Sequence, residues 1–161
     1  MFTYYNTLFF SIRCNPSMRI FIILLFGLFV SSSVFAEDAT VKMLNKLGKE
    51  NKVFSTKIVK VDVGDIVVWK ATNRGHNVEF IMKGGVPEGV EKFKSKVGKD
   101  TFYTFSISGI YAYWCSPHKA AGMIGFVIVG HDLSNLDSIK SIKYFGKSKK
   151  VAAEIIAQLE Q

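Results

Sequence analysis

Apolar and polar residues alternate in short runs along much of the chain between residues 40 and 129. In one run, Val67, Trp69 and Ala71 fall on the same face, as expected of a strand with one buried side. Clusters of Gly, Asn, Asp and Lys separate the runs, and many short strands with such spacing indicate a β-sandwich or a β-barrel. We predict strands at residues 40–46, 53–61, 65–71, 77–80, 101–107, 111–115 and 124–129.

The stretch between residues 82 and 99 lacks this regularity. Residues 83–89 contain adjacent glycines and a proline, which predict a loop. Lysines at positions 92, 94, 96 and 99 then alternate with Phe93 and Val97. Because lysines protect sheet edges against aggregation, this pattern favours a solvated surface or edge strand over a binding motif.

After residue 130 the apolar positions follow a helical period. Residues 132–135 offer N-cap side chains, and apolar residues follow at helical spacing until Gly146. A second helix with an apolar stripe is predicted over residues 147–161. Helices this short do not stand alone, so we expect both to cover a sheet face. The predicted fold is all-β, with a C-terminal helical extension at residues 132–161.

The N-terminus has the features of a secretory signal. Residues 20–30 are almost entirely apolar, Arg19 precedes them, and a cleavage site of the small-residue type follows at 31–36. The apolar run is too short for a comfortable membrane span. We predict cleavage after Ala36, which leaves residues 37–161 as a single exported domain without stable membrane insertion.

Met18 lies directly before this signal, and a signal that starts there has ordinary proportions. Our hypothesis is that residues 1–17 reflect an upstream, mis-assigned start. The alternative is a genuinely long leader, which N-terminal sequencing of the unprocessed precursor would reveal.

The composition suits one domain with a basic surface. The chain has 161 residues, of which 48% are hydrophobic, and its formal net charge is +8. Removal of residues 1–36, which hold two arginines and no acidic residue, lowers the charge to +6. Such a positive net charge attracts acidic partners by long-range electrostatic steering. Nucleic acid is the usual partner of a basic domain, but an exported protein rarely meets it, so we expect none.

The cysteines narrow the chemistry further. Cys14 lies in the predicted leader, so Cys115 is the one cysteine of the exported domain, and no internal disulfide can form there. Exported proteins usually pair their cysteines, and a single one indicates a reactive or metal-binding thiol. A buried, inert cysteine is the alternative.

Cys115 opens the motif Cys-Ser-Pro-His-Lys-Ala-Ala-Gly-Met. Its thiol, the imidazole of His118 and the thioether of Met123 are too far apart for one helical face, but a short loop that turns at Gly122 can bring them together. A blue copper site needs two imidazoles and one thiolate in a plane, with a weak axial methionine. The loop supplies three of these donors, and His76, in a Gly-His-Asn sequence, is the natural fourth.

Each of these residues also has an ordinary interpretation. A histidine after a glycine is more often a loop residue than a ligand, and a lone methionine is more often in the core; it is the combination at this spacing that favours a metal site. Asn77 is predicted to tie the two ligand loops together and to donate a hydrogen bond near the Cys115 sulfur. An ordinary turn asparagine is an equal alternative. His131, the third histidine, is interpreted as a surface residue outside the site.

Four protein donors fill the coordination shell, whereas a catalytic metal keeps a position open. We therefore predict an electron carrier in which one copper ion alternates between Cu(II) and Cu(I), and no enzymatic activity. The rival hypothesis is a protein that delivers or stores copper, although the chain has no Met-rich or His-rich tract. A multicopper oxidase would need more histidines than the three present. A structural sandwich with an accidental grouping of these residues is the remaining alternative.

With these residues in place, the sequence resembles the cupredoxins, the small blue copper proteins. The resemblance rests on His76-Asn77 and the loop at 115–123, and it extends over nearly all of residues 37–161. The C-terminal helices, the basic charge and the exported precursor are similar to the pseudoazurin family, while loop length alone also resembles plastocyanin. The resemblance implies an eight-stranded Greek-key β-sandwich, one type 1 copper, and a periplasmic shuttle that donates electrons to nitrite reductase or other respiratory reductases.

In that family, the histidine of the ligand loop lies near the surface in an apolar patch ringed by lysines. The resemblance therefore implies that His118 is the electron port. The implied docking residues are Pro117, Ala120 and Ala121 in the patch, and Lys119, Arg74 and Lys83 in its basic rim. The expected partners are acidic redox proteins, such as nitrite reductase or c-type cytochromes, in transient complexes with a small interface. We expect a monomer.

Overall fold

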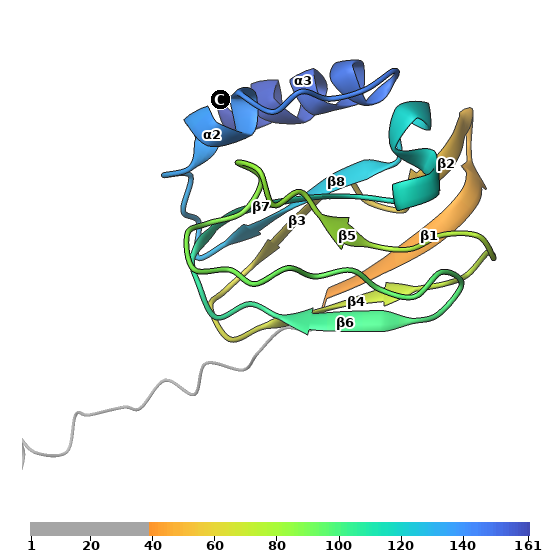
Figure 1. Cartoon of the computed structure of the whole chain (residues 1–161), viewed down its shortest axis with the longest axis horizontal. Helices are drawn as coiled ribbons and strands as arrows, with labels where there is room; N and C mark the ends of the chain where they lie inside the picture. The colour runs from red at the N-terminus through yellow and green to blue at the C-terminus, as the bar shows by residue number, and fades with distance from the viewer. Residues whose placement is uncertain (1–38) are drawn as a thin grey trace, which may run out of the picture. The chain divides into compact units, whose positions relative to one another are not determined.

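Two four-stranded sheets and two helices make up the computed structural model, which describes residues 39–161 (Figure 1). The first sheet has the strand order β2–β1–β4–β6 and the second β3–β8–β7–β5. The strands are β1 (Ala39–Leu47), β2 (Glu50–Phe54), β3 (Ile58–Val61), β4 (Ile66–Lys70), β5 (Glu79–Phe80), β6 (Thr101–Thr104), β7 (Gly109–Trp114) and β8 (Ile124–Val129). The pairs β1–β4 and β3–β8 are parallel, and the other strand pairs are antiparallel. The predicted Greek-key sandwich is confirmed.

The predicted leader at residues 1–36, with its start at Met18 and its cleavage site, lies outside the described residues. Within residues 39–161, no helix has the length and apolar character needed to cross a membrane.

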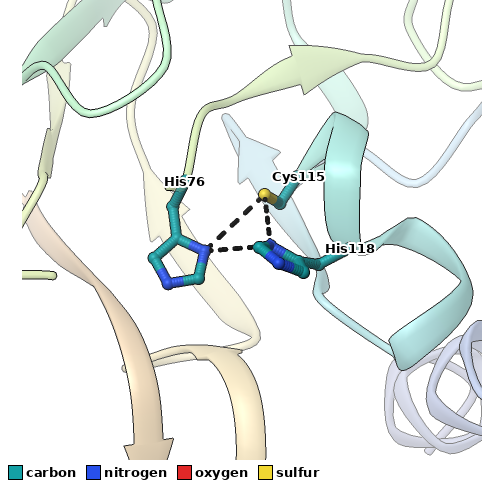
Figure 2. Close-up of side chains that lie close together, drawn as sticks. All are labelled: His76, Cys115 and His118. Carbon is teal, nitrogen blue, oxygen red and sulfur yellow. Dashed lines mark hydrogen bonds between the residues drawn. The ribbon is translucent and has the colours of Figure 1, made fainter. Parts of the chain in front are cut away.

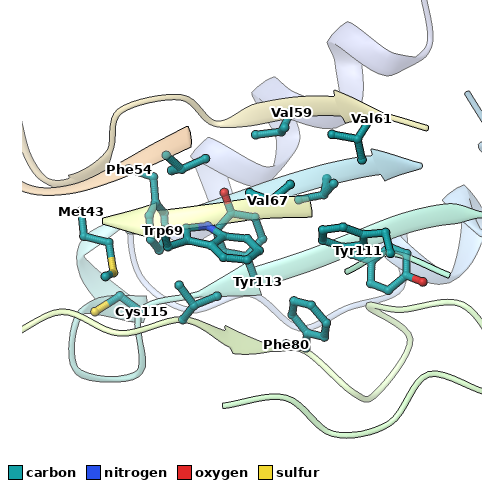
Figure 3. Packing of buried hydrophobic residues seen from close by; sticks show 14 of the residues in the cluster. Met43, Phe54, Val59, Val61, Val67, Trp69, Phe80, Tyr111, Tyr113 and Cys115 are labelled. Carbon is teal, nitrogen blue, oxygen red and sulfur yellow. The ribbon is translucent and has the colours of Figure 1, made fainter. Parts of the chain in front are cut away.

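The main core fills the space between the two sheets. Val67 and Trp69 of β4 are fully buried there, on the face that the alternation predicted. From the other sheet, Tyr111 and Tyr113 of β7 point into the same space, and Cys115 belongs to this cluster (Figure 3). Cys115, which directly follows β7, is thus both a core residue and the candidate thiol ligand.

The outer face of the second sheet carries a second core. Along β8, Val127 and Val129 belong to the main core, whereas Phe126 and Ile128 belong to the second cluster. Every residue of β8 is therefore buried, as expected of a strand covered on both faces.

The two C-terminal helices cover this outer face, as predicted (Figure 1). They are α2 (Leu136–Lys140), which contributes the fully buried Ile139, and α3 (Ser148–Leu159), which contributes Ile155. The first helix is shorter than the prediction, which extended it to Gly146. Its regular bonding ends at Ser141, whose hydroxyl donates to the Ser138 carbonyl at 2.7 Å. The next backbone bonds, from Ile142 to Ile139 and from Tyr144 to Ile142, span only three and two residues.

The strand predicted at residues 53–61 is wrong as a single element, because the chain changes sheets in its middle. The amide of Ser55 still donates to Lys42 in β1 at 2.8 Å, but the carbonyl of Lys57 accepts from Phe126 in β8 at 2.8 Å. Residues 55–57 are Ser-Thr-Lys, so the apolar run is interrupted where the chain changes sheets. Apolar residues resume at Ile58, and for that reason the two strands were predicted as one.

The lysine-rich stretch at residues 92–99 is also not a strand. It forms one isolated bridge, between Lys94 and Glu79, and its Phe93 packs against the main core. The strand predicted at 101–107 ends at Thr104, because the amide of Phe105 donates instead to the turn carbonyl of Asp65 at 3.0 Å.

We predict that Ile155→Ala lowers the free energy of unfolding by about 3 kcal/mol, because it opens a cavity between α3 and the sheet. The neighbouring Ile156→Ala removes the same atoms from a half-buried position, so it should cost clearly less. Urea unfolding of both variants measures the difference. Equal losses would show that α3 does not pack through the face that carries Ile155.

Candidate metal centre

The thiol of Cys115 is positioned by the end of β7. Cys115 is fully buried and extended (φ −86°), and it precedes a 3₁₀ helix, η1 (Ser116–Ala121), which has a proline in its first turn. A 3₁₀ turn is tight, and here the amide of His118 donates to the Cys115 carbonyl at 2.9 Å. The imidazole is thereby brought back over the thiol from only three residues away.

The loop then returns the chain to β8. Gly122 ends η1 in the left-handed region (φ 99°), which glycine adopts without steric cost. The next residue, Met123, is fully buried; its carbonyl accepts from the Cys115 amide at 2.9 Å, and its own amide donates to His118 at 3.3 Å. The structure therefore brings Cys115, His118 and Met123 together in one hydrogen-bonded loop.

His76 reaches this loop from a distant segment. It lies between Gly75 (φ 88°) and β5, and its imidazole is fully buried. Its Nδ1 is 3.1 Å from Nδ1 of His118 and 3.8 Å from Sγ of Cys115, and Sγ is 3.3 Å from Nδ1 of His118 (Figure 2). One thiol and two imidazole nitrogens thus face a common point.

These distances and donor types fit a transition-metal ion. Metal–nitrogen bonds of about 2.0 Å and metal–sulfur bonds of about 2.3 Å place three donors around one ion roughly 3.5–4 Å apart, close to the observed separations. Two imidazoles with a thiolate and a nearby methionine are the donor set of a blue copper site. No carboxylate of the described residues joins the cluster, which argues against a calcium or magnesium site.

Residues 41–130 match the family model of copper binding proteins of the plastocyanin/azurin family, which covers more than half of the chain. The chain belongs to this family. It is 39% identical over 127 residues to a pseudoazurin from Paracoccus pantotrophus, covering 79% of this chain and 85% of the relative. It is 34% identical over 125 residues to one from Methylorubrum extorquens, covering 78% and 84%.

The fold of this plastocyanin/azurin family member is likewise similar to that of solved pseudoazurins. The crystal structure of a pseudoazurin from Hyphomicrobium denitrificans matches with a TM-score of 0.73 and 35% identity over 78% of this chain and all of the other. The pseudoazurin resemblance seen in the sequence is therefore confirmed, and with it membership of a family of copper-binding electron carriers.

Asn77 joins the two ligand segments of this family member. Its side-chain oxygen accepts from the amide of Ser116 at 2.8 Å, and its side-chain nitrogen donates to the Ser116 hydroxyl at 3.0 Å. The hydrogen bond to the Cys115 sulfur comes from the backbone of Asn77 instead of its side chain. The side chain thus holds the loops together, and the amide beside it contacts the thiol.

Sequence patterns gave no indication of Glu79. Its carboxylate accepts from the Ser116 hydroxyl at 2.6 Å and the Trp114 indole at 3.4 Å, and it pairs with Lys94 at 3.3 Å. Burial raises the pKa of this carboxyl, but the hydrogen bonds from Ser116 and Lys94 outweigh it, so the pKa lies below its ordinary value. Glu79 therefore stays charged and fixes both residues that flank Cys115.

Asn45 is a second residue that the sequence did not reveal. Its side-chain oxygen lies 3.0 Å from Nε2 of His76, and its backbone amide donates to the side chain of Asn73 at 2.8 Å. Nothing in the strand pattern of β1 distinguishes this asparagine, which is 31 residues from the histidine it contacts.

The C-terminal helix does more than cover a sheet face. The hydroxyl of Ser148, in the first turn of α3, donates to the carbonyl of Lys119, and the amide of Lys147 donates to Ala120 at 2.9 Å. Carbonyl groups at the end of η1 are thus satisfied by the start of α3. The helix holds the ligand loop in place as well as closing the second core.

The predicted docking residues all lie on the surface. Pro117, Ala120 and Ala121 are exposed on η1 around the half-buried His118. The ammonium of Lys119 lies 5.0 Å from the centre of the Trp114 ring.

The remaining charged residues of the predicted rim, Arg74 and Lys83, are exposed. Lys83 directly precedes Gly84, which lies against Ser138 of α2. The 3₁₀ helix η1 contacts α3 instead, so Lys83 and η1 lie next to different helices. His131 is exposed and lies outside the cluster.

The burial of the donors keeps them uncharged in the metal-free protein. Burial, the neighbouring His118 and the charge of Lys52 lower the pKa of His76 to about 4. Burial also lowers the pKa of His118 and raises the pKa of Cys115, although amides of Asn77 and His118 oppose the latter shift. A metal ion that binds here must displace the thiol proton.

We predict that the metal-free protein loses stability as the pH falls from about 6.5 to about 4. Because folding lowers the pKa of His76, the unfolded chain binds its proton first, so the stabilisation is complete above the unfolded pKa and is lost in this window. The loss attributable to His76 should be about 2 kcal/mol after solvent screening is allowed for.

Denaturant unfolding at several pH values measures this loss as the difference between the wild type and His76→Gln. His131→Gln, a change at an exposed histidine outside the cluster, is the control and should follow the wild type. The same pH dependence in all three proteins would contradict the prediction.

Proposed function

We propose that the protein is a one-electron carrier that holds one type 1 copper ion through His76, Cys115, His118 and Met123. The observation that carries this proposal is the buried cluster of one thiol and two imidazole nitrogens separated by 3.1–3.8 Å, with Met123 hydrogen-bonded beside it. Membership of the copper-binding plastocyanin/azurin family supports it.

The surroundings of the donors suit electron exchange better than catalysis. His76, Cys115 and Met123 are fully buried, and the four donors together leave no position for a substrate. Copper supplies the Cu(II)/Cu(I) couple when bound. The chain's own contribution is to hold both imidazoles and the thiol through Asn77, Asn45 and η1, so that the ligand positions change little between the two states.

His118 is proposed as the point where electrons enter and leave. It is the one member of the cluster that is not fully buried, and the exposed Pro117, Ala120 and Ala121 lie beside it in η1. An apolar patch of this kind suits a small, transient interface. Lys119 and Arg74 would supply the basic rim of this patch. The assignment of Lys83 to the same rim stays a prediction.

We infer that the partners are acidic redox proteins such as nitrite reductase or c-type cytochromes, met in the periplasm by a monomeric carrier. The support is the basic charge of the chain and the pattern of a signal peptide at residues 1–36, with a start at Met18 and cleavage after Ala36. Residues 37–161 would then be the working domain.

We predict that the copper-loaded protein is intensely blue, and that reduction bleaches it without loss of copper. Cys115→Ser should remove the colour, because the colour arises from the thiolate–copper bond, whereas His131→Gln should keep it. Visible spectra with parallel metal analysis test this. Loss of copper on reduction, or transfer of copper to an acceptor protein, would favour the delivery or storage function instead.

We predict that Lys119→Glu slows electron transfer to an acidic c-type cytochrome about threefold or more at low ionic strength, with a shallower salt dependence. Lys60→Glu is the matched control. Lys60 is exposed on β3 opposite Ile128, at the end of β8 remote from the ligand loop. Stopped-flow measurement of the electron-transfer rates at several ionic strengths tests this prediction. Equal slowing by both variants would contradict a docking role for Lys119.

A further inference from the structure

Lys52 and Asn45 face each other across the hairpin of β1 and β2. The register pairs Leu44 with Val53 and Lys46 with Asn51, which sets Asn45 opposite Lys52. Lys52 adopts a left-handed backbone (φ 56°), a conformation that is uncommon for a residue with a side chain. Its ammonium donates to the side-chain oxygen of Asn45 at 2.9 Å.

The same oxygen of Asn45 also contacts the candidate metal centre. It lies 3.0 Å from Nε2 of His76, while Nδ1 of that ring faces Cys115 and His118. A continuous chain of contacts therefore runs from the ammonium of Lys52 through one amide oxygen to an imidazole of the cluster.

The hydrogen-bonding capacity of lysine fixes which atoms donate and which accept in these contacts. An ammonium can only donate hydrogen bonds, so the Asn45 atom that faces Lys52 must be the carbonyl oxygen and not the amide nitrogen. An oxygen that accepts from Lys52 can only accept from His76, so Nε2 of His76 must carry the proton. In a neutral imidazole the other nitrogen is then unprotonated, and Nδ1 presents its lone pair toward Cys115 and His118.

We propose that Lys52 is a positioning residue that orients the Asn45 amide and thereby fixes His76 in the tautomer whose Nδ1 can bind the metal. The identity of that metal as copper rests on the proposed function. The tautomer itself does not, because it is set in the protein before any metal binds.

The charge of Lys52 adds a second consequence. Within residues 39–161 Lys52 forms no salt bridge. Only the oxygen of Asn45 separates its ammonium from the ring of His76. A cation held this close disfavours the more positive metal state, so Lys52 should raise the reduction potential of the centre.

The decisive measurement is the tautomer of His76 in metal-free protein at neutral pH, read from long-range ¹⁵N–¹H correlation spectra. The wild type should show the Nε2–H form alone. In Lys52→Met the Asn45 amide is free to turn over, and the Nδ1–H form should become detectable, because one lost hydrogen bond lowers the preference for the Nε2–H form about fivefold. Lys49→Met removes a charge from the same surface cleft and should leave the tautomer unchanged.

A rescue variant separates orientation from a general effect on folding. In Lys52→Met, the additional change Asn45→Asp supplies a carboxylate that can only accept, so it should restore the Nε2–H form. In copper-loaded protein, Lys52→Met should have a lower reduction potential than the wild type and than Lys49→Met.

A wild type with the Nδ1–H form, or a Lys52→Met variant that keeps the Nε2–H form alone, would overturn the proposal, whatever the potential. Because the tautomer is read without metal, this failure is distinct from a failure of the proposed function, which would appear as the absence of blue colour with copper.

Discussion

The central constraint on this protein is that three candidate metal donors, His76, Cys115 and His118, lie in or beside a hydrophobic core with their donor atoms within 4 Å of one another. Buried polar groups are costly unless they have partners, so the fold surrounds them with fixed hydrogen bonds. Asn77 joins both ligand segments through Ser116, and the amide of Cys115 is bonded to Met123 on the returning chain. These hydrogen bonds hold the two ligand segments in place independently of a bound metal.

The second sheet connects this constraint to the rest of the fold. β7 and β8 flank the ligand loop and are buried on both faces, so the loop starts and ends on the most protected strands. Covering their outer face requires α3, and the start of that helix bonds to the end of η1 through Ser148. The helix that completes the core is therefore also the support for the exposed side of the metal centre.

Much of the fold follows from local patterns. Alternation placed Val67 and Trp69 on the buried face of β4, and the change to helical spacing after residue 130 predicted both helices. The crossover at residues 55–57 was missed because apolar residues resume at Ile58 after only three polar residues, while the hydrogen-bond partners change from β1 to β8. Backbone pairing has no sequence period of its own. The length of α2 was overestimated because apolar residues at helical spacing continue beyond Ser141, where the backbone bonds begin to span fewer residues.

By itself, the sequence predicted the type of chemistry, because a single cysteine in residues 39–161, followed by His118 and Met123 at loop spacing, is typical of a copper site. It also singled out His76 and Asn77. Only the tertiary structure decided how these residues are held: by Glu79, by Asn45 with Lys52 across a hairpin, and by the first turn of α3. Donor identity is local and can be read along the chain. The contacts that orient those donors join residues far apart in sequence, and they exist only once the sheets have packed.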